Sequence, residues 1–524
     1  MYSRRLDGLA QYVGKVMDQF HVPGASVAVV LADDILFCRG FGVRDLTTRA
    51  PVNENTLFSI ASNTKPFTGT AFAMLESEGQ LKAEDRVIDY LSSFRLSSPD
   101  TTQRMRVGDL LSHMSGLPAH AGDLLFFPPT KYTLNEVVDR IHGLPVAEPF
   151  GTTFAYENVL YAVGALLIQE VSGQSYTDFI SERLFQPLGM ISSRVNSRVN
   201  AEGLRPEDNV ATGYRELDGQ LRAVPPLIWT NNPGAGGIYS SAGEMLHWMR
   251  LHLAGGICRT GSGANRILYT KAAQEQMWSP HIRIPLDSSA TRADQLQYQD
   301  LAYGSGWFLS TYRGERLVWH TGEFPGFTSK MTLMPSHKLG ILVLTNQEHD
   351  EVFEAITNQC LDWFLEIDES DWLKLLTESA ETERRKKETE WATVLATRTL
   401  EADSTVGWKS YEGVFEDSWY GDVSFSISEQ KLLVRFEETP ELHGELNPWG
   451  QNLFVIRWDD RLLAGDALIE FAHDARGSAE SATMKRLSPI EAPSFDFNDL
   501  HLVRKATSGK STQHTSDQST VPRS

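Results

Sequence analysis

Apolar residues follow strand-like and helix-like periods in separate blocks along the chain. Residues 24 to 43, GASVAVVLADDILFCRGFGV, predict two strands joined by a tight turn. A second β-rich block, residues 303 to 346, predicts three strands with turns near residues 313–314 and 336–338. Mostly helical patterns lie between the two blocks. We therefore expect the two blocks to pair into one antiparallel sheet that is flanked by a helical insertion.

The pattern changes after about Leu376. Residues 377 to 405 begin with TESAETERRKKETEW and keep no wide apolar face, which predicts a charged helical connector. Short alternating segments from 406 to 506, such as KLLVRFEE and NLFVIRWDD, predict a small antiparallel barrel or sandwich. The polar residues 507 to 524 are expected to be disordered. The sequence thus predicts an α+β domain over residues 1 to 376, followed by a connector, an all-β domain and a tail.

Composition and charge narrow the class of protein. A chain of 524 residues exceeds one ordinary core, so at least two domains are expected. Lys and Arg number 48 against 68 Asp and Glu, and the net charge of -20 argues against nucleic acid or an anionic membrane as a partner. No apolar run approaches the length of a membrane span, and charges interrupt the N-terminal stretch where a signal core would lie. We expect a globular cytoplasmic protein.

The sequence contains no motif that supports a metal or cofactor site. The cysteines Cys38, Cys258 and Cys360 lie far apart, without the spacing of metal ligands or of a disulfide framework. The histidines are scattered. GAGG at residues 234 to 237 is followed by no lysine, which argues against a phosphate loop. We expect neither a metal nor a cofactor.

The stretch FSIASNTKPFTGTAFAMLESEGQL places Ser62 and Lys65 three residues apart at the start of a predicted helix, about residues 62 to 78. Residues at i and i+3 share a helix face, so Lys65 could take the proton of the Ser62 hydroxyl. The same pattern also fits a capped helix with a solvated lysine. Ser-x-x-Lys recurs at Ser428 and Lys431, near a predicted strand turn. The motif alone therefore does not establish a catalytic pair.

Three further stretches add polar residues that are ambiguous when taken singly. Tyr156 and Asn158 precede a predicted helix, His320 stands on a predicted strand in VWHTGEF, and LLSHMSGLP covers residues 110 to 118. Tyr156 alone fits a half-buried aromatic residue, Asn158 a helix cap, and His320 a surface histidine. His113, in the last stretch, is interpreted as structural.

Together these motifs resemble a known family. Ser-x-x-Lys, Tyr-x-Asn and His-x-Gly follow one another as in the serine β-lactamase and penicillin-binding-protein superfamily, particularly its class C, esterase and D-aminopeptidase branch. GGIYSSAGEMLHWM from Gly236 and RLFQPLGM from Arg183 are similar to further family landmarks. The resemblance covers about residues 10 to 365 and implies a β-lactamase/transpeptidase-like fold. The C-terminal segments resemble the lipocalin-like β domain of some peptidases in this family.

The resemblance also implies a catalytic set. Ser62 would be the nucleophile, with Lys65 and Tyr156 as the base system and His320 as the remaining catalytic residue. Asn158 would hold both Lys65 and a substrate carbonyl through its amide.

The same resemblance implies that a strand binds the substrate. Thr321, Gly322 and Glu323 would form this binding segment. The oxyanion would accept hydrogen bonds from the backbone N–H groups of Ser62 and Glu323. Gly322 would leave room for a substrate that lies against the strand.

These expectations combine into a function: a serine hydrolase, of the peptidase or esterase type, that acts on a small ester, amide or peptide. His320 replaces a lysine of the family, and a mostly neutral histidine argues against efficient β-lactam hydrolysis. An acidic residue near a substrate amine would favour a peptidase, and Glu157 and Glu323 are candidates. Two alternatives stay open: an acyltransferase that uses the same acyl-enzyme, and a non-catalytic scaffold or filament-forming protein. The sequence does not predict the oligomeric state.

Overall fold

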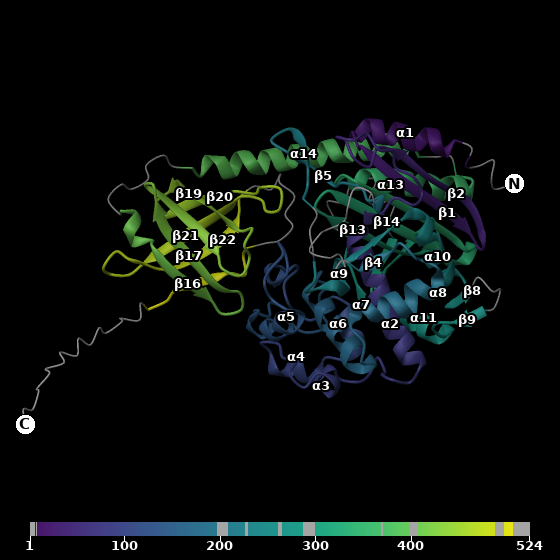
Figure 1. Cartoon of the computed structure of the whole chain (residues 1–524), viewed down its shortest axis with the longest axis horizontal. Helices are drawn as coiled ribbons and strands as arrows, with labels where there is room; N and C mark the ends of the chain where they lie inside the picture. Colours follow the sequence, from purple (N-terminus) through teal and green to yellow (C-terminus); the bar gives the residue numbers. More distant parts are fainter. Residues whose placement is uncertain are drawn as a thin grey trace, which may run out of the picture.

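The computed structural model describes residue 6 and residues 8–195, 208–225, 229–259, 265–286, 299–367, 370–398, 407–487 and 497–506. The tail over residues 507–524, which we expected to be disordered, lies outside this part of the chain. Two bodies joined by a long helix make up the described chain (Figure 1). We refer to them as the N-terminal domain and the barrel.

The N-terminal domain is built on an eight-stranded antiparallel sheet of order β10, β11, β12, β13, β14, β15, β1 and β2. In that order the strands are Ile282–Arg283, Gln299–Tyr303, Phe308–Tyr312, Glu315–Phe324, Phe327–Met334, Leu339–Thr345, Gly24–Leu31 and Asp34–Gly42. Strand β1 pairs with β15, where Ala28 lies opposite Leu342. The predicted pairing of the two β blocks into one antiparallel sheet is therefore confirmed.

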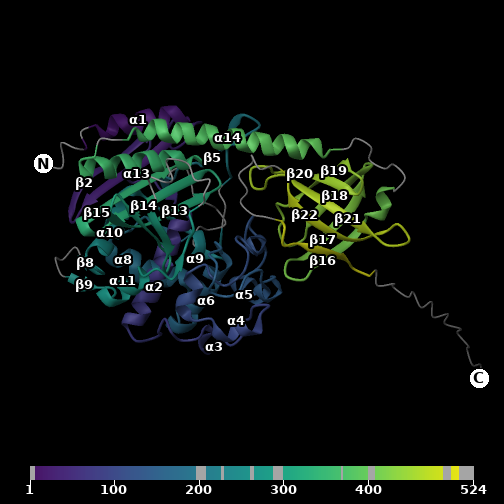
Figure 2. The same cartoon turned by 180° about the vertical axis from the view of Figure 1, so that it is seen from behind.

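Both faces of β1 are buried, against different layers. Val27 and Val29 belong to the core beneath α1 (Leu9–Phe20) and α13 (Asp350–Leu365), two helices seen together in Figure 2. Ala28 and Val30 belong to the core on the other face, with α10 (Ala242–Leu253). A strand covered on both faces needs apolar residues at successive positions, and this explains the VAVV run of the sequence.

The helical insertion contains nine helices of the described chain besides α10: α2 (Lys65–Ser77), α3 (Val87–Tyr90), α4 (Pro99–Arg104), α5 (Leu134–Arg140), α6 (Val159–Ser172), α7 (Tyr176–Ile180), α8 (Gln186–Leu188), α9 (Pro233–Gly236) and α11 (Lys271–Met277). Its short strands are β3 (Phe58–Ser59), β4 (Arg194–Val195), β5 (Tyr214–Leu217), β6 (Gln220–Ala223), β7 (Ile238–Ser240), β8 (Ile257–Arg259) and β9 (Asn265–Ile267). Helix α2 lies in the centre, and every residue from Lys65 to Leu75 is buried.

The second β block forms four complete strands, β12 to β15, so the prediction of three was wrong. Both predicted turns are present, but a further turn at Pro325 and Gly326 separates β13 from β14. Gly326 has a φ of +81°, a conformation that glycine adopts without the steric cost of a side chain. The Pro-Gly pair was the available signal for this turn.

Helix α14 (Trp372–Ala396) runs from the N-terminal domain to the barrel (Figure 1). Its start is anchored, because Trp372 and Leu376 are buried in the core beside α13. Farther along, exposed ion pairs stand one turn apart, such as Arg384 with Glu388 at 2.8 Å. A helix with a charged exposed surface is what the sequence predicts for most of this stretch.

Strands β16 to β23 close into an eight-stranded antiparallel barrel. They are Gly413–Asp417, Gly421–Ser428, Lys431–Phe436, His443–Gly450, Leu453–Trp458, Ala467–His473, Ala479–Arg486 and His501–Arg504. Aromatic rings fill the interior: the Phe425 ring centroid lies 5.2 Å from those of Phe415 and Phe471. The predicted α+β fold with a C-terminal barrel is confirmed, and the barrel has a packed core of its own.

The second Ser-x-x-Lys copy has no partners of a catalytic kind. Ser428 and Lys431 face each other across the β17–β18 turn. The Lys431 amine binds Glu445 at 2.7 Å on the barrel surface. This copy is a strand turn, as its surrounding pattern predicted.

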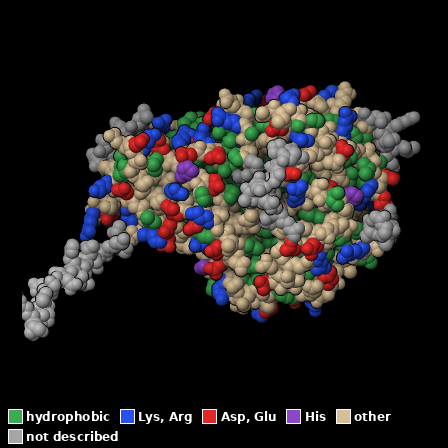
Figure 3. All heavy atoms as spheres, in the orientation of Figure 1, with side chains coloured by type: hydrophobic (Ala, Val, Ile, Leu, Met, Phe, Trp, Pro, Cys, Tyr) green, Lys and Arg blue, Asp and Glu red, His purple; other side chains and the backbone are tan. Residues whose placement is uncertain are grey.

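The visible surface carries interspersed acidic and basic side chains (Figure 3). Among the helices that the structure describes, none combines the length and the apolarity of a membrane span. Within the same residues, no three His, Cys, Asp or Glu side chains gather as they would around a metal ion. The thiols of Cys38, Cys258 and Cys360 are free.

Candidate active site

Ser62 lies in a strained turn at the entrance of α2. The predicted helix is divided here: a 3-10 turn, Ala61–Thr64, precedes the α-helix. Ala61 has a φ of +47°, which is costly for a residue with a side chain. The Ser329 hydroxyl on β14 donates to the Ile60 carbonyl at 2.9 Å. The sheet thus fixes the turn that presents Ser62.

Lys65 is buried rather than solvated, and its amine touches Ser62. The Nζ atom lies 2.9 Å from Ser62 Oγ and donates hydrogen bonds to Asn158 Oδ1 at 2.7 Å and to the Ala235 carbonyl at 3.0 Å. Burial lowers the pKa of Lys65 well below its usual value, and the charge of Asp123 opposes this only in part. In a neutral amine two N–H groups serve the two carbonyl oxygens. The lone pair is then left to accept the Ser62 proton.

Tyr156 is the second group beside Ser62. Burial raises the pKa of its phenol, and a hydrogen bond with Ser62 opposes this rise. The Lys65 amine lies 4.7 Å from the centroid of the Tyr156 ring. Tyr156 therefore remains a phenol at neutral pH and can donate a hydrogen bond.

Asn158 connects Lys65 to a buried carboxylate. Although it occupies the N-cap position of α6, its side chain makes no capping bond. It accepts from Lys65 and donates through Nδ2 to Asp123 Oδ2 at 3.0 Å. His120 Nδ1 lies 3.1 Å from the same Asp123 oxygen. The sequence predicted the Asn158 contact with Lys65 but neither Asp123 nor His120.

The segment after His320 forms a locally open strand edge. Pairing of β13 with β12 ends at Trp319, whereas pairing with β14 continues to Phe324. A Cβ atom on Gly322 would stand 2.1 Å from the Ile60 carbonyl oxygen. Glycine is required here because the strand passes directly against the turn that carries Ser62. Room for a substrate beside Gly322 stays a prediction.

His320 lies behind the site. Its side chain is 1% exposed and does not line the cavity beside Ser62. Nδ1 donates to the Thr321 carbonyl at 2.5 Å, which leaves Nε2 to accept from the Tyr303 hydroxyl at 2.9 Å. Burial, with a smaller contribution from the Lys65 charge, lowers the pKa of His320 to about 3. The imidazole is neutral and supplies no positive charge to a ligand.

The two acidic candidates differ in position. Glu157 is fully buried, accepts a hydrogen bond from the Ser115 hydroxyl at 2.7 Å, and has its pKa raised to about 8 by burial. Glu323 lines the cavity, as does Thr321. Burial and the nearby charge of Glu348 raise the pKa of Glu323. Only Glu323 can therefore face a bound molecule.

A cavity of about 300 Å³ opens beside Ser62. It is lined by Ser62, His120, Asp123, Phe126, Phe127, Tyr156, Asn158, Arg215, Trp229, Phe308, Thr321, Glu323, Phe324, Pro325 and Glu348. One wall is aromatic, because the Trp229 ring stacks between Phe126 and Phe324 with both centroid distances at 5.4 Å. The cavity thus combines the nucleophile with an apolar wall and several ionisable groups.

Arg215 ties this cavity to the barrel. Its Nε donates to both carboxylate oxygens of Glu348 at 3.0 Å, and its Nη1 donates to the Leu462 carbonyl of the barrel at 2.7 Å. Glu348 also accepts from the Gly326 N–H at 2.7 Å, in the turn that follows Glu323. The barrel is therefore linked, through two side chains, to the hairpin that lines the cavity.

Loss of Arg215 is expected to destabilise the protein. In Arg215→Ala, the Glu348 carboxylate, whose side chain is 12% exposed, would lose its cation, at a cost of about 3 kcal/mol. Urea unfolding followed by tryptophan fluorescence measures this loss. Arg86→Ala is the control, because its ion pair with Asp89 is exposed and should contribute little to the unfolding midpoint. Equal midpoints for the two variants would contradict the bridging role.

Two pairs of cavity residues were not predicted from the sequence, one local and one joined only by the fold. His120 and Asp123 stand three residues apart in a loop of otherwise small and apolar residues, which was a weak signal. Arg215 and Glu348 are 133 residues apart, and no local pattern relates them.

Comparison with protein families finds a match over most of the chain. The Beta-lactamase family model matches residues 9–359. A second model, Domain of unknown function (DUF3471), matches residues 399–504, which include the barrel.

Two curated relatives share part of their length with this chain. Unguisins hydrolase ungD of Aspergillus violaceofuscus is 26% identical over 400 residues, covering 72% of this chain and 68% of that protein. Protein flp of Staphylococcus aureus is 29% identical over 356 residues, covering 67% of this chain and 66% of that protein. The chain thus spans slightly less than two thirds of the length of Protein flp.

Solved structures with the same fold include two of bacterial and archaeal origin. The octameric penicillin-binding protein homologue from Pyrococcus abyssi has a TM-score of 0.59 at 20% identity, covering 95% of this chain and 100% of that chain. The class C β-lactamase from Rhodobacter sphaeroides has a TM-score of 0.53 at 21% identity, covering 68% of this chain and 99% of that chain. The likeness shows a shared fold.

Proposed function

Because this chain belongs to the Beta-lactamase family, we propose that it is a serine hydrolase that forms an acyl-enzyme at Ser62 on a small ester or amide. The family supports a serine hydrolase in general, and the acyl-enzyme and the substrate class are our proposal. The observation that carries it is the 2.9 Å contact between Ser62 Oγ and the buried Lys65 amine. A serine hydroxyl becomes a good nucleophile when an adjacent base takes its proton.

The reaction proceeds in two steps. Lys65 takes the Ser62 proton, and Ser62 Oγ attacks the substrate carbonyl to give a tetrahedral intermediate. The bond to the leaving group then breaks, the leaving group departs with a proton, and the acyl-enzyme remains. The oxyanion accepts hydrogen bonds from the backbone N–H groups of Ser62 and Glu323. Water then attacks the ester and releases the acid, with Lys65 and Tyr156 as the proton network around Ser62.

The cavity favours esters and amides with an apolar group. Trp229 and Phe324 offer such a group a flat apolar surface. His320 is neutral and buried, so it cannot serve a substrate carboxylate in the way a lysine would. This supports ester, amide or peptide substrates over β-lactams.

We favour hydrolysis over acyl transfer and over a scaffold role. The name of the Unguisins hydrolase, a relative over 72% of the chain, supports water as the acceptor. An acyltransferase would use the same acyl-enzyme with a different acceptor. A scaffold role is disfavoured because it would not require the buried amine at Lys65, whose desolvation is costly.

Intact-protein mass spectrometry tests the proposal. The full chain is exposed briefly to a p-nitrophenyl ester, a D-amino-acid p-nitroanilide or a penicillin. We expect a transient adduct with the mass of the acyl group, which is absent in Ser62→Ala. An adduct of equal yield in Ser62→Ala, or turnover that survives this substitution, would overturn the proposal. Added alcohols or amines that divert the acyl group would identify transfer instead of hydrolysis.

A further inference from the structure

His120 and Asp123 form an acid–base pair at the cavity wall that the mechanism above does not use. His120 Nδ1 lies 3.1 Å from Asp123 Oδ2, and because a carboxylate accepts, Nδ1 carries the proton. The Asp123 side chain is 3% exposed, whereas that of His120 is 47% exposed. Among the described residues, no hydrogen bond reaches His120 Nε2. Asp123 therefore holds the imidazole through Nδ1, and His120 lines the cavity beside Ser62.

Both residues are connected to the nucleophile's surroundings. The backbone N–H of His120 donates to the backbone carbonyl of Tyr156 at 2.7 Å, which fixes the histidine next to the tyrosine that borders Ser62. Asp123 accepts from Asn158, whose own oxygen accepts from Lys65. One amide thus separates the carboxylate of the pair from the base that faces Ser62.

We propose that His120, oriented by Asp123, is a second catalytic acid–base residue, which protonates the leaving group in acylation and takes a proton from water in deacylation. This inference rests on the proposed function. A histidine that is held by a carboxylate through Nδ1 and lines the same cavity as the nucleophile has the arrangement of a general acid–base residue.

Lys65 and His120 each transfer one proton in acylation and one in deacylation. In acylation, Ser62 Oγ bonds to the carbonyl carbon and its proton passes to Lys65; the leaving atom separates with the Nε2 proton of protonated His120. In deacylation, water bonds to the same carbon and gives a proton to the now neutral His120. The Ser62 ester bond breaks, and Ser62 Oγ recovers its proton from the Lys65 ammonium. Both residues return to their starting forms.

The electrostatic environment supports His120 as the acid and Lys65 as the base. The hydrogen bond to Asp123 raises the pKa of His120, with burial and Lys65 acting in the opposite direction and Glu323 adding to the rise. Burial lowers the pKa of Lys65. The site therefore favours a protonated His120 beside a neutral Lys65, an acid and a base at one pH.

Other ionisable groups at the cavity do not take this role. Tyr156 keeps its proton, because burial raises its pKa. Arg215 and Glu348 line the cavity but bind each other. The imidazole is the side chain in this cavity whose ordinary pKa lies nearest to neutral pH.

A series of esters with one acyl group and different leaving alcohols tests the proposal. A p-nitrophenolate leaves without a proton, whereas an alkoxide needs one. In His120→Asn we expect the acylation rate of alkyl esters to fall about 10²-fold or more, while acylation by the p-nitrophenyl ester changes little. The alkaline limb of the pH profile for alkyl esters, set by loss of the His120 proton, should also disappear.

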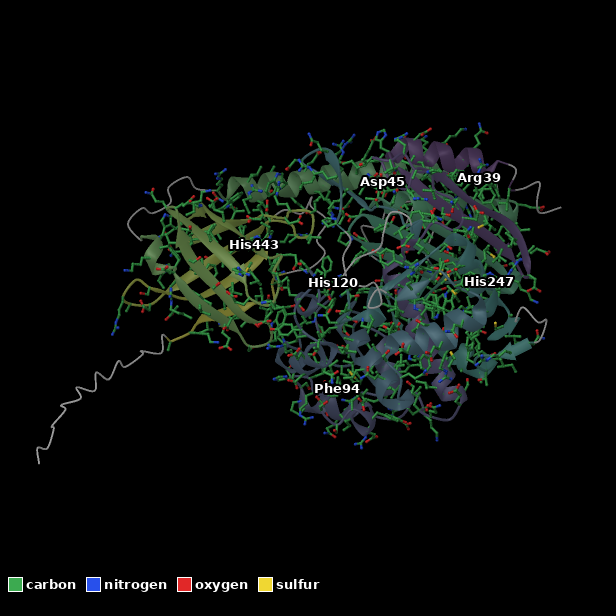
Figure 4. All side chains as sticks on the ribbon, in the orientation of Figure 1. Arg39, Asp45, Phe94, His120, His247 and His443 are labelled. Atoms are coloured by element: carbon green, nitrogen blue, oxygen red, sulfur yellow. The ribbon has the colours of Figure 1, made fainter. Side chains whose placement is uncertain are left out.

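Matched variants separate this role from a structural one. His443 is the control histidine, because it also pairs with an aspartate, Asp459, at 3.1 Å but lies on the barrel surface. His120 lies instead on the side of the N-terminal domain that faces the barrel (Figure 4). His443→Asn should leave all rates unchanged. Tyr156→Phe should lower the rates of all esters similarly.

Three outcomes would overturn the inference. Equal loss for every ester in His120→Asn would assign the histidine to the shape of the pocket, and unchanged rates would leave it no role. Dependence on the leaving group in Tyr156→Phe alone would assign the proton to Tyr156. In each case turnover that still requires Ser62 would leave the proposed function intact, whereas turnover in Ser62→Ala would remove it.

Discussion

Replacement of Lys65 by methionine is expected to lower turnover by about 10⁴-fold or more, and adding Ser62→Ala to the same chain is expected to cause little further loss. The two side chains touch at 2.9 Å and act as one unit, because the hydroxyl attacks only when the amine accepts its proton. Steady-state rates of the single and double variants with one ester measure this. Multiplicative losses would mean that Lys65 acts independently of Ser62.

The pH dependence of wild-type activity tests whether Lys65 acts as a base. Below the lowered pKa, Lys65 is an ammonium and cannot accept the Ser62 proton, so kcat/KM should rise with pH through that pKa.

The free energy of unfolding should also rise with pH because of Lys65. Between the lowered pKa of the folded chain and about 10.4, the unfolded chain binds the extra proton, and the free energy of unfolding therefore increases with pH. Lys65→Met should remove this contribution to the pH dependence of stability, which urea unfolding at several pH values tests.

Gly322→Ala is expected to cause the second large loss, about 10²- to 10³-fold in kcat, since it should displace the donor that follows it in the strand. The added Cβ would stand 2.1 Å from the Ile60 carbonyl oxygen and 2.6 Å from Ser329 Oγ, so the strand and the Ser62 turn must separate. The Glu323 N–H, our proposed oxyanion donor, would move with the strand. Overpacking of this kind typically destabilises by about 1–3 kcal/mol.

A matched glycine provides the control. Gly14 lies in α1, and a Cβ there would meet no atom within 4 Å. Gly14→Ala should therefore keep full activity and gain up to about 1 kcal/mol of stability through helix propensity. Turnover rates and urea unfolding of Gly322→Ala and Gly14→Ala test this prediction. Wild-type rates in a stably folded Gly322→Ala would show that the strand tolerates a side chain and that close contact with the turn is unimportant.

Much of the fold was predictable, because strand and helix periods are local. Alternating segments after residue 406 correctly indicated the barrel, and the apolar run before Leu31 indicated a strand. The error in the second β block arose because the turn signal of Pro325 and Gly326 was not used to divide the stretch between β13 and β14. The strand count there depended on turn chemistry rather than on hydrophobic pattern.

The candidate site was predictable only in part. The i, i+3 spacing brought Ser62 and Lys65 together, and motif order added Tyr156 and Asn158. His320 matched the motif, yet the structure buries it against Tyr303. A strand pattern specifies which residues alternate, but it does not reveal which of two buried faces meets the cavity.

The sequence by itself therefore determined the elements and the spacing of the Ser-x-x-Lys pair, since both depend on backbone geometry over a few residues. Tertiary structure alone decided the chemistry of that pair. Lys65 loses its water, and its pKa falls, because Ala235, 170 residues away, and the surrounding helices enclose it. Likewise the Arg215 link from the cavity to Leu462 spans 247 residues and two domains. Desolvation and charge pairing depend on which distant segments the topology brings into contact, and no local pattern records that.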